Sequence, residues 1–289
     1  MSGTLYVVAT PIGNLSEMSP RAVETLRFVD LIAAEDTRNT LKLLNHFDIK
    51  TPQTSNHKFN EEKTVDRLVA ELKEGKNIAV VSDAGTPCVN DPGFILVNRA
   101  AAEGITVLPI SGPCAAIAAL SASGLPADTF RFMGFFPREK KDALKITSLI
   151  KEGGKDLYIF YESPMRIEET LSVIKDELPD ARIALFNDLT KAHERAYRGT
   201  PASVFSELSA NPNAKKGEYA MLLYYEPVER ENASDCEVSL SPEALLVDEI
   251  VKSGCSVKEA ISKLSKDKTV PASKNELYAA SLRLKELFG

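Results

Sequence analysis

Tryptophan is absent from the sequence, and cysteine and aromatic residues are scarce: the 289 residues include no Trp, four Cys and 7% aromatic residues. Cys88, Cys114, Cys236 and Cys255 show neither a CxxC pair nor the Cys/His spacing of a zinc site, so we expect reduced thiols and no bound metal. No apolar run approaches the ~18 residues of a membrane helix, and the first expected strand begins at Leu5, which leaves no room for a signal peptide. These absences predict a cytoplasmic protein without a membrane segment.

Two common phosphate-binding motifs are also missing. Gly75 and Lys76 resemble the end of a P-loop, but Ala70 stands where its first glycine belongs, and no GxGxxG follows a strand. A P-loop NTPase and an ordinary dinucleotide dehydrogenase are therefore both disfavoured. The formal charge of −6 argues against indiscriminate coating of nucleic acid. Basic residues do cluster over 138–141, 191–198 and the last fifty residues, which leaves a local basic patch open.

Short apolar runs alternate with segments of helical spacing in the first half of the chain. Ser19 as N-cap and Pro20 at the first helical position open one expected helix, and residues 64–73 form another. Runs rich in Val, Ile, Leu and Ala predict strands over residues 5–10, 31–36, 78–83 and 105–111. This alternation predicts an α/β fold with a mainly parallel, covered sheet.

The same pattern restarts in the second half. Strands are expected over residues 157–163, 182–188 and 218–225 and within 120–140, with a helix over 164–178. We place a domain boundary near Pro126. The expected organisation is an α/β domain over 1–126, a second α/β domain over 127–228, a polar linker over 229–240 and a helical extension over 241–289. The extension is expected to hold helices over 242–252, 256–266 and 273–287.

Polar residues follow the expected strands where those strands end. They are Thr10, Glu35, Asp36, Ser82, Asp83 and Ser111 in the first half, and Glu162, Ser163, Asn187 and Asp188 in the second. Carboxyl ends of parallel strands share one edge of a sheet, and ligands bind there. One polar loop with Gly and Pro ordinarily does no more than connect a strand to a helix, but several such loops together favour a ligand-binding site. In this site Gly85 permits close backbone approach and Pro87 stiffens the turn. The loop 9–20 has one glycine and no lysine, which suits a neutral or cationic ligand better than a triphosphate.

Several motifs occur together along most of the chain. They are 10-TPIGNLSEMSPRAVETL-26, 33-AAEDTRNTLKLL-44, 55-SNHKFNE-61, 82-SDAGTPCVNDPG-93, 110-ISGPCAAIAALSASGLP-126, 134-GFFPR-138, 161-YESPMRI-167, 189-LTKAHE-194 and 217-GE-218. AEDTR, SDAGTP and YESP are specific as a set. On these motifs the chain resembles the tetrapyrrole-methylase superfamily, and within it the enzymes that methylate a cytidine 2′-hydroxyl in small-subunit ribosomal RNA.

The resemblance implies the two-domain tetrapyrrole-methylase-like α/β fold (class III methyltransferase) with a small all-helical, helix-turn-helix-like extension, and a homodimer. It implies S-adenosyl-L-methionine in the cleft between the α/β domains. Carried over by position, the cofactor-binding residues are Thr10, Pro11, Ile12, Gly13, Asn14, Asp83, Ala84, Gly85, Thr86, Pro87, Val89, Gly112, Pro113, Cys114, Ala115, Phe160, Tyr161, Asn187, Glu218 and Tyr219. The implied substrate is a cytidine in the decoding region of 16S rRNA, offered as rRNA or as the 30S ribosomal subunit.

The resemblance also places residues 35–38 and His57 on the RNA side. The chain departs from the family pattern at Lys58, Phe59 and Met165, where a Glu-His pair and a His are expected, and at 187–188, where Arg-Glu is expected. These departures bear on the RNA target rather than on the cofactor.

Methyl transfer to a ribose hydroxyl requires alignment of donor and acceptor and removal of a proton. We nominate Asp36 as base or base-orienter, Arg38 as partner of a phosphate or alkoxide, Lys191 as a second candidate and Glu162 for positioning the nucleotide. Each has a structural alternative: Arg38 pairing with its neighbouring acids, Lys191 lying on the surface beside Glu194, and Glu162 complementing a helix dipole.

Two rival functions remain open on the sequence. A small-molecule methylase of the tetrapyrrole type would need a roomier, less basic cleft, and a non-catalytic module would retain the cofactor fold alone. The helical extension carries eight Lys/Arg and seven Asp/Glu. It either docks RNA through Lys263, Lys266, Lys268 and Lys274 or packs against the dimer.

Overall fold

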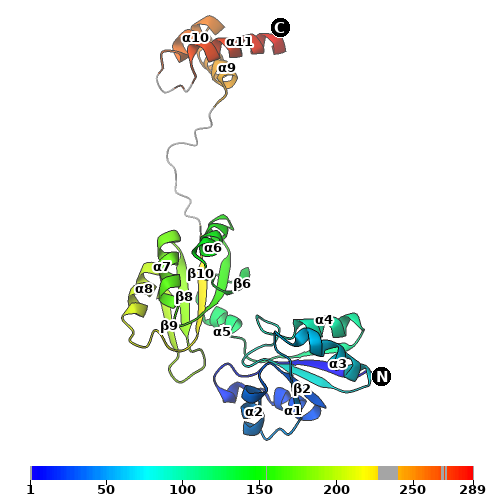
Figure 1. Ribbon diagram of the computed structural model, residues 1–289. Helices are drawn as coiled ribbons and strands as arrows, with labels where there is room; N and C mark the ends of the chain where they lie inside the picture. The colour runs from blue at the N-terminus through cyan, green and yellow to red at the C-terminus, as the bar shows by residue number, and fades with distance from the viewer. Residues whose placement is uncertain (1, 154, 227–239, 268–269, 271, 289) are drawn as a thin grey trace. The chain divides into compact units, whose positions relative to one another are not determined.

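The structure is a computed structural model that describes residues 2–153, 155–226, 240–267, 270 and 272–288 (Figure 1). The chain forms two compact units, residues 1–228 and 229–289. The expected linker falls almost wholly outside the described residues, as does Cys236. The expected division of the first unit near Pro126 stays a prediction.

A five-stranded parallel sheet forms the first layer of the larger unit. Its order is β3-β2-β4-β1-β5, with strands β1 (Thr4–Val8), β2 (Leu31–Ala34), β3 (Gln53–Ser55), β4 (Ile78–Val81) and β5 (Thr106–Ile110). All four residues of β4 are buried, as its continuous apolar run predicts for a central strand covered on both faces. The strand order reverses on either side of β4, and in such sheets ligands bind beyond the carboxyl ends of the strands.

Helices cover both faces of this sheet (Figure 1). Helices α1 (Pro20–Phe28) and α2 (Thr37–His46) share one hydrophobic cluster with the sheet, and α3 (Glu61–Lys73) and α4 (Phe94–Ala102) share the other. Helix α1 begins as expected, because Pro20 occupies its first turn and the Ser19 side chain accepts a 3.1 Å hydrogen bond from the Ala22 N–H. A short 3₁₀ helix, η1 (Leu15–Glu17), precedes it.

The second sheet is mixed. Its order is β6-β7-β10-β8-β9, with strands β6 (Phe130–Phe135), β7 (Leu157–Glu162), β8 (Arg182–Asn187), β9 (Arg195–Gly199) and β10 (Tyr219–Tyr224). Only β6 and β7 pair in parallel, and the other three pairings are antiparallel. The mainly parallel pattern that the first half predicts therefore does not extend to this sheet. The loop 188–194 is long enough for a hairpin but short for a crossover, and β10 is buried along its whole length, so its composition carries no sign of direction.

The second sheet is also covered on both faces. Helices α6 (Lys140–Glu152), α7 (Ile167–Glu177) and α8 (Pro201–Ser209) bury one face, and α5 (Ala115–Ala122) buries the other through Ala116 and Ala119. Strands β7 and β8 both run antiparallel to β10. Their carboxyl ends and the start of β10 therefore lie at the same edge.

The smaller unit is helical, as expected, with α9 (Pro242–Ser253), α10 (Val257–Leu264) and α11 (Lys274–Phe288) around a core of their own. Ser256 and Glu259 form a capping box at the start of α10. The α/β fold with a small helical C-terminal region is thus confirmed. Among the described residues, no helix is long and apolar enough to cross a membrane, and no group of three His, Cys, Asp or Glu side chains is placed to hold a metal ion.

Candidate functional site

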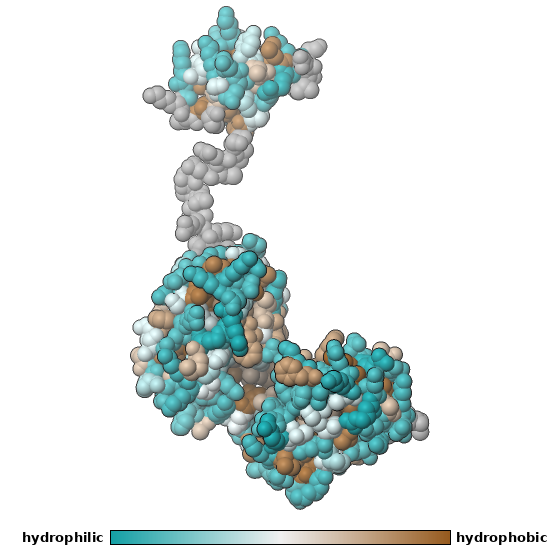
Figure 2. All heavy atoms as spheres, viewed as in Figure 1, coloured by the Kyte–Doolittle hydropathy of each residue, from teal (hydrophilic) through white to brown (hydrophobic). Residues whose placement is uncertain are grey.

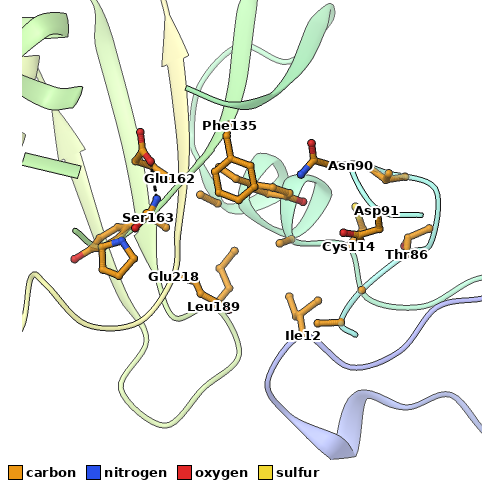
Figure 3. A pocket seen from close by; sticks show the side chains of 18 residues that line it. Ile12, Thr86, Asn90, Asp91, Cys114, Phe135, Glu162, Ser163, Leu189 and Glu218 are labelled. Carbon is orange, nitrogen blue, oxygen red and sulfur yellow. Dashed lines mark hydrogen bonds between the residues drawn. The ribbon is translucent and has the colours of Figure 1, made fainter. Parts of the chain in front are cut away.

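A cavity of about 260 Å³ opens in the first unit where the ends of strands from both sheets meet (Figure 3). Hydrophobic side chains gather in this hollow, whereas polar ones cover much of the visible surface (Figure 2). The lining residues are Ile12, Ala84, Gly85, Thr86, Val89, Asn90, Asp91, Cys114, Ala115, Phe135, Tyr161, Glu162, Ser163, Pro164, Leu189, Glu218, Tyr219 and Ala220. No Lys, Arg or His is among these lining residues.

The turn after β4 is held against the loop after β1. Thr10 and Gly85 exchange two backbone hydrogen bonds, of 2.8 and 3.0 Å, as an isolated antiparallel bridge. Gly85 has φ +80°, and a Cβ there would lie 3.2 Å from the Ile12 side chain, so this turn requires a residue without a side chain. Thr86 ties the turn to the loop after β5, because its hydroxyl donates a 3.1 Å hydrogen bond to the Pro113 carbonyl. Three loops of the first sheet therefore form one wall.

The rest of that wall, residues 88–93, is held in an unusual backbone conformation. Cys88 and Asn90 both have positive φ, at 68° and 69°. Such conformations persist at non-glycine residues only where the surroundings enforce them. Here the buried Glu61 carboxylate from α3 accepts hydrogen bonds of 2.8 and 3.0 Å from the N–H groups of Gly93 and Ile95, which fixes the start of α4.

The opposite wall comes from the second sheet and α5. The Tyr161 hydroxyl oxygen accepts a 3.2 Å hydrogen bond from the Ala116 N–H, and its ring meets Phe135 edge-on with centroids 6.1 Å apart. Burial raises the pKa of Tyr161 to about 12, so the phenol is neutral at physiological pH. Tyr161 thus positions the first turn of α5 against β7.

Lys191 lies beside the cavity rather than on its lining. Its ammonium donates to Asp188 Oδ1 at 2.8 Å and to Glu218 Oε2 at 2.9 Å. Partial burial opposes its positive charge, but the hydrogen bonds and charges of these two acids outweigh burial and raise the pKa of Lys191. The lysine stem also covers Gly13, where an added Cβ would come within 2.5 Å of Lys191 Cγ. A protonated Lys191 therefore bridges two acids of the second sheet, packs its stem against the first-sheet loop at Gly13, and is a poor proton acceptor.

Acidic groups at the ends of β2 and β4 hydrogen-bond to each other's backbone. Asp83 Oδ1 accepts from the Asp36 N–H at 3.2 Å, and Glu35 Oε2 accepts from the Asp83 N–H at 3.2 Å. Asp36 caps α2, and its carboxylate accepts hydrogen bonds of 3.0 and 2.6 Å from the Arg38 guanidinium. Hydrogen bonds from the Arg38 side chain and backbone hold the pKa of Asp36 at about 2, which makes it a weak base. The Arg38 side chain is 86% exposed.

Asp91 is the half-buried acid of the cavity wall. Burial first, and then the negative charges of Glu35 and Asp83, raise the pKa of Asp91 to about 6, against a hydrogen bond from Ser82 that lowers it. No basic side chain of the described residues forms an ion pair with Asp91. Glu162, by contrast, is fully buried and satisfied: it accepts from the Ser163 N–H at 2.7 Å and the Thr170 hydroxyl at 2.7 Å, and Arg166 lies 3.3 Å away. These bonds give Glu162 a structural part at the start of α7.

Many of the residues nominated from the sequence line this cavity. They are Ile12, Ala84, Gly85, Thr86, Val89, Cys114, Ala115, Tyr161, Glu162, Glu218 and Tyr219. The other nominated residues are not among its lining residues: Thr10, Pro11, Gly13, Asn14, Asp83, Pro87, Gly112, Pro113, Phe160, Asn187, Asp36, Arg38 and Lys191. Phe160 points into the core of the second sheet, and the Asn187 amide donates to the carbonyls of Lys216 and Glu218. The specific roles assigned to all these residues remain predictions.

The sequence nominations omitted several lining residues, namely Asn90, Asp91, Phe135, Ser163, Pro164, Leu189 and Ala220. Asn90 and Asp91 belong to the same polar loop as Asp83, so their position after β4 was the available signal. Phe135 and Leu189 are ordinary hydrophobic residues at strand ends, and nothing in their pattern separates a cavity wall from a core.

A fold of two such sheets with a shared cavity at their strand ends is that of the tetrapyrrole methylases. Residues 4–204 match the family described as Tetrapyrrole (Corrin/Porphyrin) Methylases, and the chain belongs to that family. Its relatives include the Ribosomal RNA small subunit methyltransferase I of Halalkalibacterium halodurans, 44% identical over 96% of this chain and 93% of the relative. The protein of the same name from Pseudomonas aeruginosa is 40% identical over 98% of both chains.

Solved structures with the same fold are more distant in sequence. Diphthine synthase superposes with a TM-score of 0.60 at 14% identity, covering 77% of this chain and 90% of that chain. The methyltransferase CobJ gives a TM-score of 0.55 at 18% identity, covering 78% and 95%. At these identities the likeness concerns the fold.

Proposed function

We propose that this protein is a methyltransferase that uses S-adenosyl-L-methionine to methylate ribosomal RNA of the small subunit, at the ribose 2′-hydroxyl of a cytidine. The observation that carries the proposal is similarity over the whole length. The rRNA methyltransferase relatives from Halalkalibacterium halodurans and Pseudomonas aeruginosa match 96% and 98% of the chain, whereas diphthine synthase and CobJ cover 77% and 78% of it. The alignments with these relatives therefore include the C-terminal helices, which lie beyond the family match at residues 4–204.

The cavity suits this cofactor chemically. Its described lining has no basic side chain to pair with a phosphate, and it includes the acids Asp91, Glu218 and the already hydrogen-bonded Glu162. Apolar side chains such as Ile12, Val89 and Phe135 offer surface for a nucleobase, while Thr86 and Asn90 offer polar contacts. A cationic, phosphate-free nucleoside fits this combination.

When bound, the cofactor supplies an electrophilic methyl group on a positively charged sulfur. The protein's part is to hold the acceptor hydroxyl in line with that methyl group and to exclude water. Lys191 joins two loops of the second sheet through Asp188 and Glu218, and its stem lies against Gly13 in the first-sheet loop, which supports the position of that loop. Arg38 is exposed at the sheet edge and carries the charge to meet an RNA phosphate, with Asp36 orienting its guanidinium.

The finer parts of the proposal concern setting and partners. We expect the substrate as 16S rRNA within the 30S subunit, a cytoplasmic location and a homodimer. Because the pKa of Asp36 is about 2 and Lys191 is protonated, we propose that the hydroxyl proton passes to a solvent molecule and that Asp36 orients Arg38.

The deciding experiment offers methyl-labelled cofactor with three acceptors: 30S subunits, protein-free 16S rRNA and a tetrapyrrole precursor. We expect label on the 30S subunit, resistant to alkaline hydrolysis at one cytidine because 2′-O-methylation blocks backbone cleavage there. Gly85→Val serves as the site variant and Gly104→Val as its control, since both glycines have positive φ but only Gly85 faces the cavity wall. Label on the tetrapyrrole alone, or on no acceptor, would contradict the proposal.

A further inference from the structure

The acids near the cavity differ in what they already contact. Asp36 is bound by Arg38, Asp83 accepts from the Asp36 N–H and from Asn39, and Glu218 accepts from Lys191. Asp91 lines the cavity, is half-buried, and has no cationic partner among the described residues. Figure 3 shows it on the same wall as Thr86 and Cys114, facing the space beyond which Leu189 and Glu218 lie.

A half-buried carboxylate without a counter-ion is costly, because burial penalises its charged form. The titratable groups around Asp91 do not offset this cost. Glu35 and Asp83 add negative charge and so disfavour the charged form of Asp91 further. Cys88 and Tyr161 are neutral, because burial raises their pKa values to about 11 and about 12. A ligand that brings a positive charge into the cavity would relieve this unfavourable arrangement.

We infer that Asp91 is the counter-charge of the cofactor's sulfonium and makes the cavity distinguish the charged methyl donor from its neutral demethylated product. This inference rests on the proposed function. As the acceptor oxygen forms its bond to the methyl carbon, the C–S bond breaks and its electron pair stays on sulfur, while the hydroxyl proton leaves to water. The sulfur thereby loses its charge, and the attraction to Asp91 is lost with it. The same residue thus favours binding of the donor and release of S-adenosyl-L-homocysteine.

A charge next to Asp91 must change its proton binding. With a cation bound, the pKa of Asp91 falls from about 6 toward or below its ordinary range. A group whose pKa is lower in the complex favours binding above its free pKa, and that advantage is lost as the pH falls through 6. Affinity for S-adenosyl-L-methionine should therefore drop by about tenfold per pH unit below 6, until the pKa of the complex is reached. Affinity for S-adenosyl-L-homocysteine should stay flat.

The test is calorimetry of the full-length chain at pH 6 with each of the two ligands, in two buffers of different ionisation enthalpy. At a pH equal to the free pKa, half of Asp91 is protonated, so S-adenosyl-L-methionine should release about half a proton and the homocysteine product about none. At pH 8 neither ligand should release protons. The comparison of the two ligands needs no variant, so it stands even if a substitution impairs folding.

Asp91→Asn keeps an oxygen that can accept from Ser82 and removes the charge. We expect it to abolish proton release and to weaken binding of S-adenosyl-L-methionine by about tenfold or more relative to binding of the product. An opposite charge next to an acid shifts the pKa of that acid by about 1–3 units. Asp142→Asn, an exposed acid on α6 outside the cavity lining, is the matched control and should behave as the unmodified chain.

Equal proton release by both ligands would overturn the inference, because Asp91 would then pair with the α-ammonium that both carry. Release that persists in Asp91→Asn, or no release in the unmodified chain, would overturn it as well. Failure of the proposed function looks different: the chain would bind neither ligand, or would bind both and label no RNA.

Discussion

At the scale of single residues, the acids of the site differ in the neighbouring groups that stabilise or destabilise their negative charge. Asp36 and Asp91 follow neighbouring strands of one sheet, yet their pKa values are about 2 and about 6. The difference comes from an arginine two residues after Asp36, and from burial near two other acids at Asp91. Proximity to the strand ends therefore does not by itself identify the acid that titrates in the physiological range.

This difference gives a prediction for the pH dependence of the reaction. Because the pKa of Asp36 lies below its ordinary value of 3.8, its pairing with Arg38 is fully present above pH 4 and is lost only as the pH falls toward 2. Asp36→Asn should therefore leave the position of any acidic limb near pH 6 unchanged, while lowering RNA methylation through a misplaced Arg38. The measurement is kcat/KM for 30S subunits from pH 5 to 9. A limb that disappears in this variant would make Asp36 the titrating group.

A second residue-scale prediction concerns Glu61, which lies outside the cavity lining and supports the end of the 88–93 loop through backbone hydrogen bonds. Glu61→Ala leaves the N–H groups of Gly93 and Ile95 without their acceptor, at a cost of about 2–4 kcal/mol in the free energy of unfolding. Glu61→Gln keeps one accepting oxygen and should cost far less. Urea denaturation checks the stability, and calorimetry under conditions where that denaturation shows both variants to be folded checks cofactor affinity. Equal losses in the two variants would show that the charge, not the hydrogen bonding, matters.

At the scale of elements, the loop 82–93 is shaped by its contact with the second sheet. Gly134 in β6 has φ +70°, and a Cβ there would lie 2.9 Å from Asn90 Oδ1. Gly124 has φ +71° but open space around it, so Gly134→Ala and Gly124→Ala share the backbone penalty of about 1 kcal/mol and differ in the contact with Asn90. We expect only Gly134→Ala to weaken binding of S-adenosyl-L-methionine, by about tenfold or less. Matching affinities by calorimetry would show that Asn90 can move without consequence.

The elements also show what the sequence can reveal. The buried run of β4, the Ser19-Pro20 start of α1 and the three C-terminal helices follow local rules and were predictable. Strands β3 and β9 were not, because both are short and their residues are largely polar or exposed. The direction of β10 was hidden by its uniform burial.

For the site, the sequence could place the loop after β4 at the ligand edge but not the orientation of its acids. Asp83 was nominated and Asp91 was not, although both lie in one loop. The side-chain directions depend on positive φ at Cys88 and Asn90, and on the distant support of Glu61. Interactions across thirty residues of chain leave no trace in local spacing.

At the scale of the whole molecule, the cavity and the core of the helical extension are formed by different residues. Every lining residue lies between Ile12 and Ala220, and the extension has its own core of residues from α9, α10 and α11. We therefore expect residues 1–228 to bind S-adenosyl-L-methionine with a Kd within about twofold of the full chain, as separate sites are nearly additive. Calorimetry measures this directly. A large loss of affinity would show that the extension supports the cavity.

The same separation predicts how the extension contributes to RNA. It carries eight Lys/Arg, and Lys266 and Lys274 are exposed. Each lysine that neutralises a phosphate releases counterions, so charge reversal at such a position weakens binding and lowers the salt slope by about one. We expect Lys266→Glu with Lys274→Glu to raise KM for 30S subunits and flatten its salt dependence, whereas Lys50→Glu, an exposed lysine of the first unit, should do neither. If the double variant instead kept the original slope while light scattering showed dissociation of a dimer, the extension would act in assembly and the RNA contacts would belong to the α/β unit.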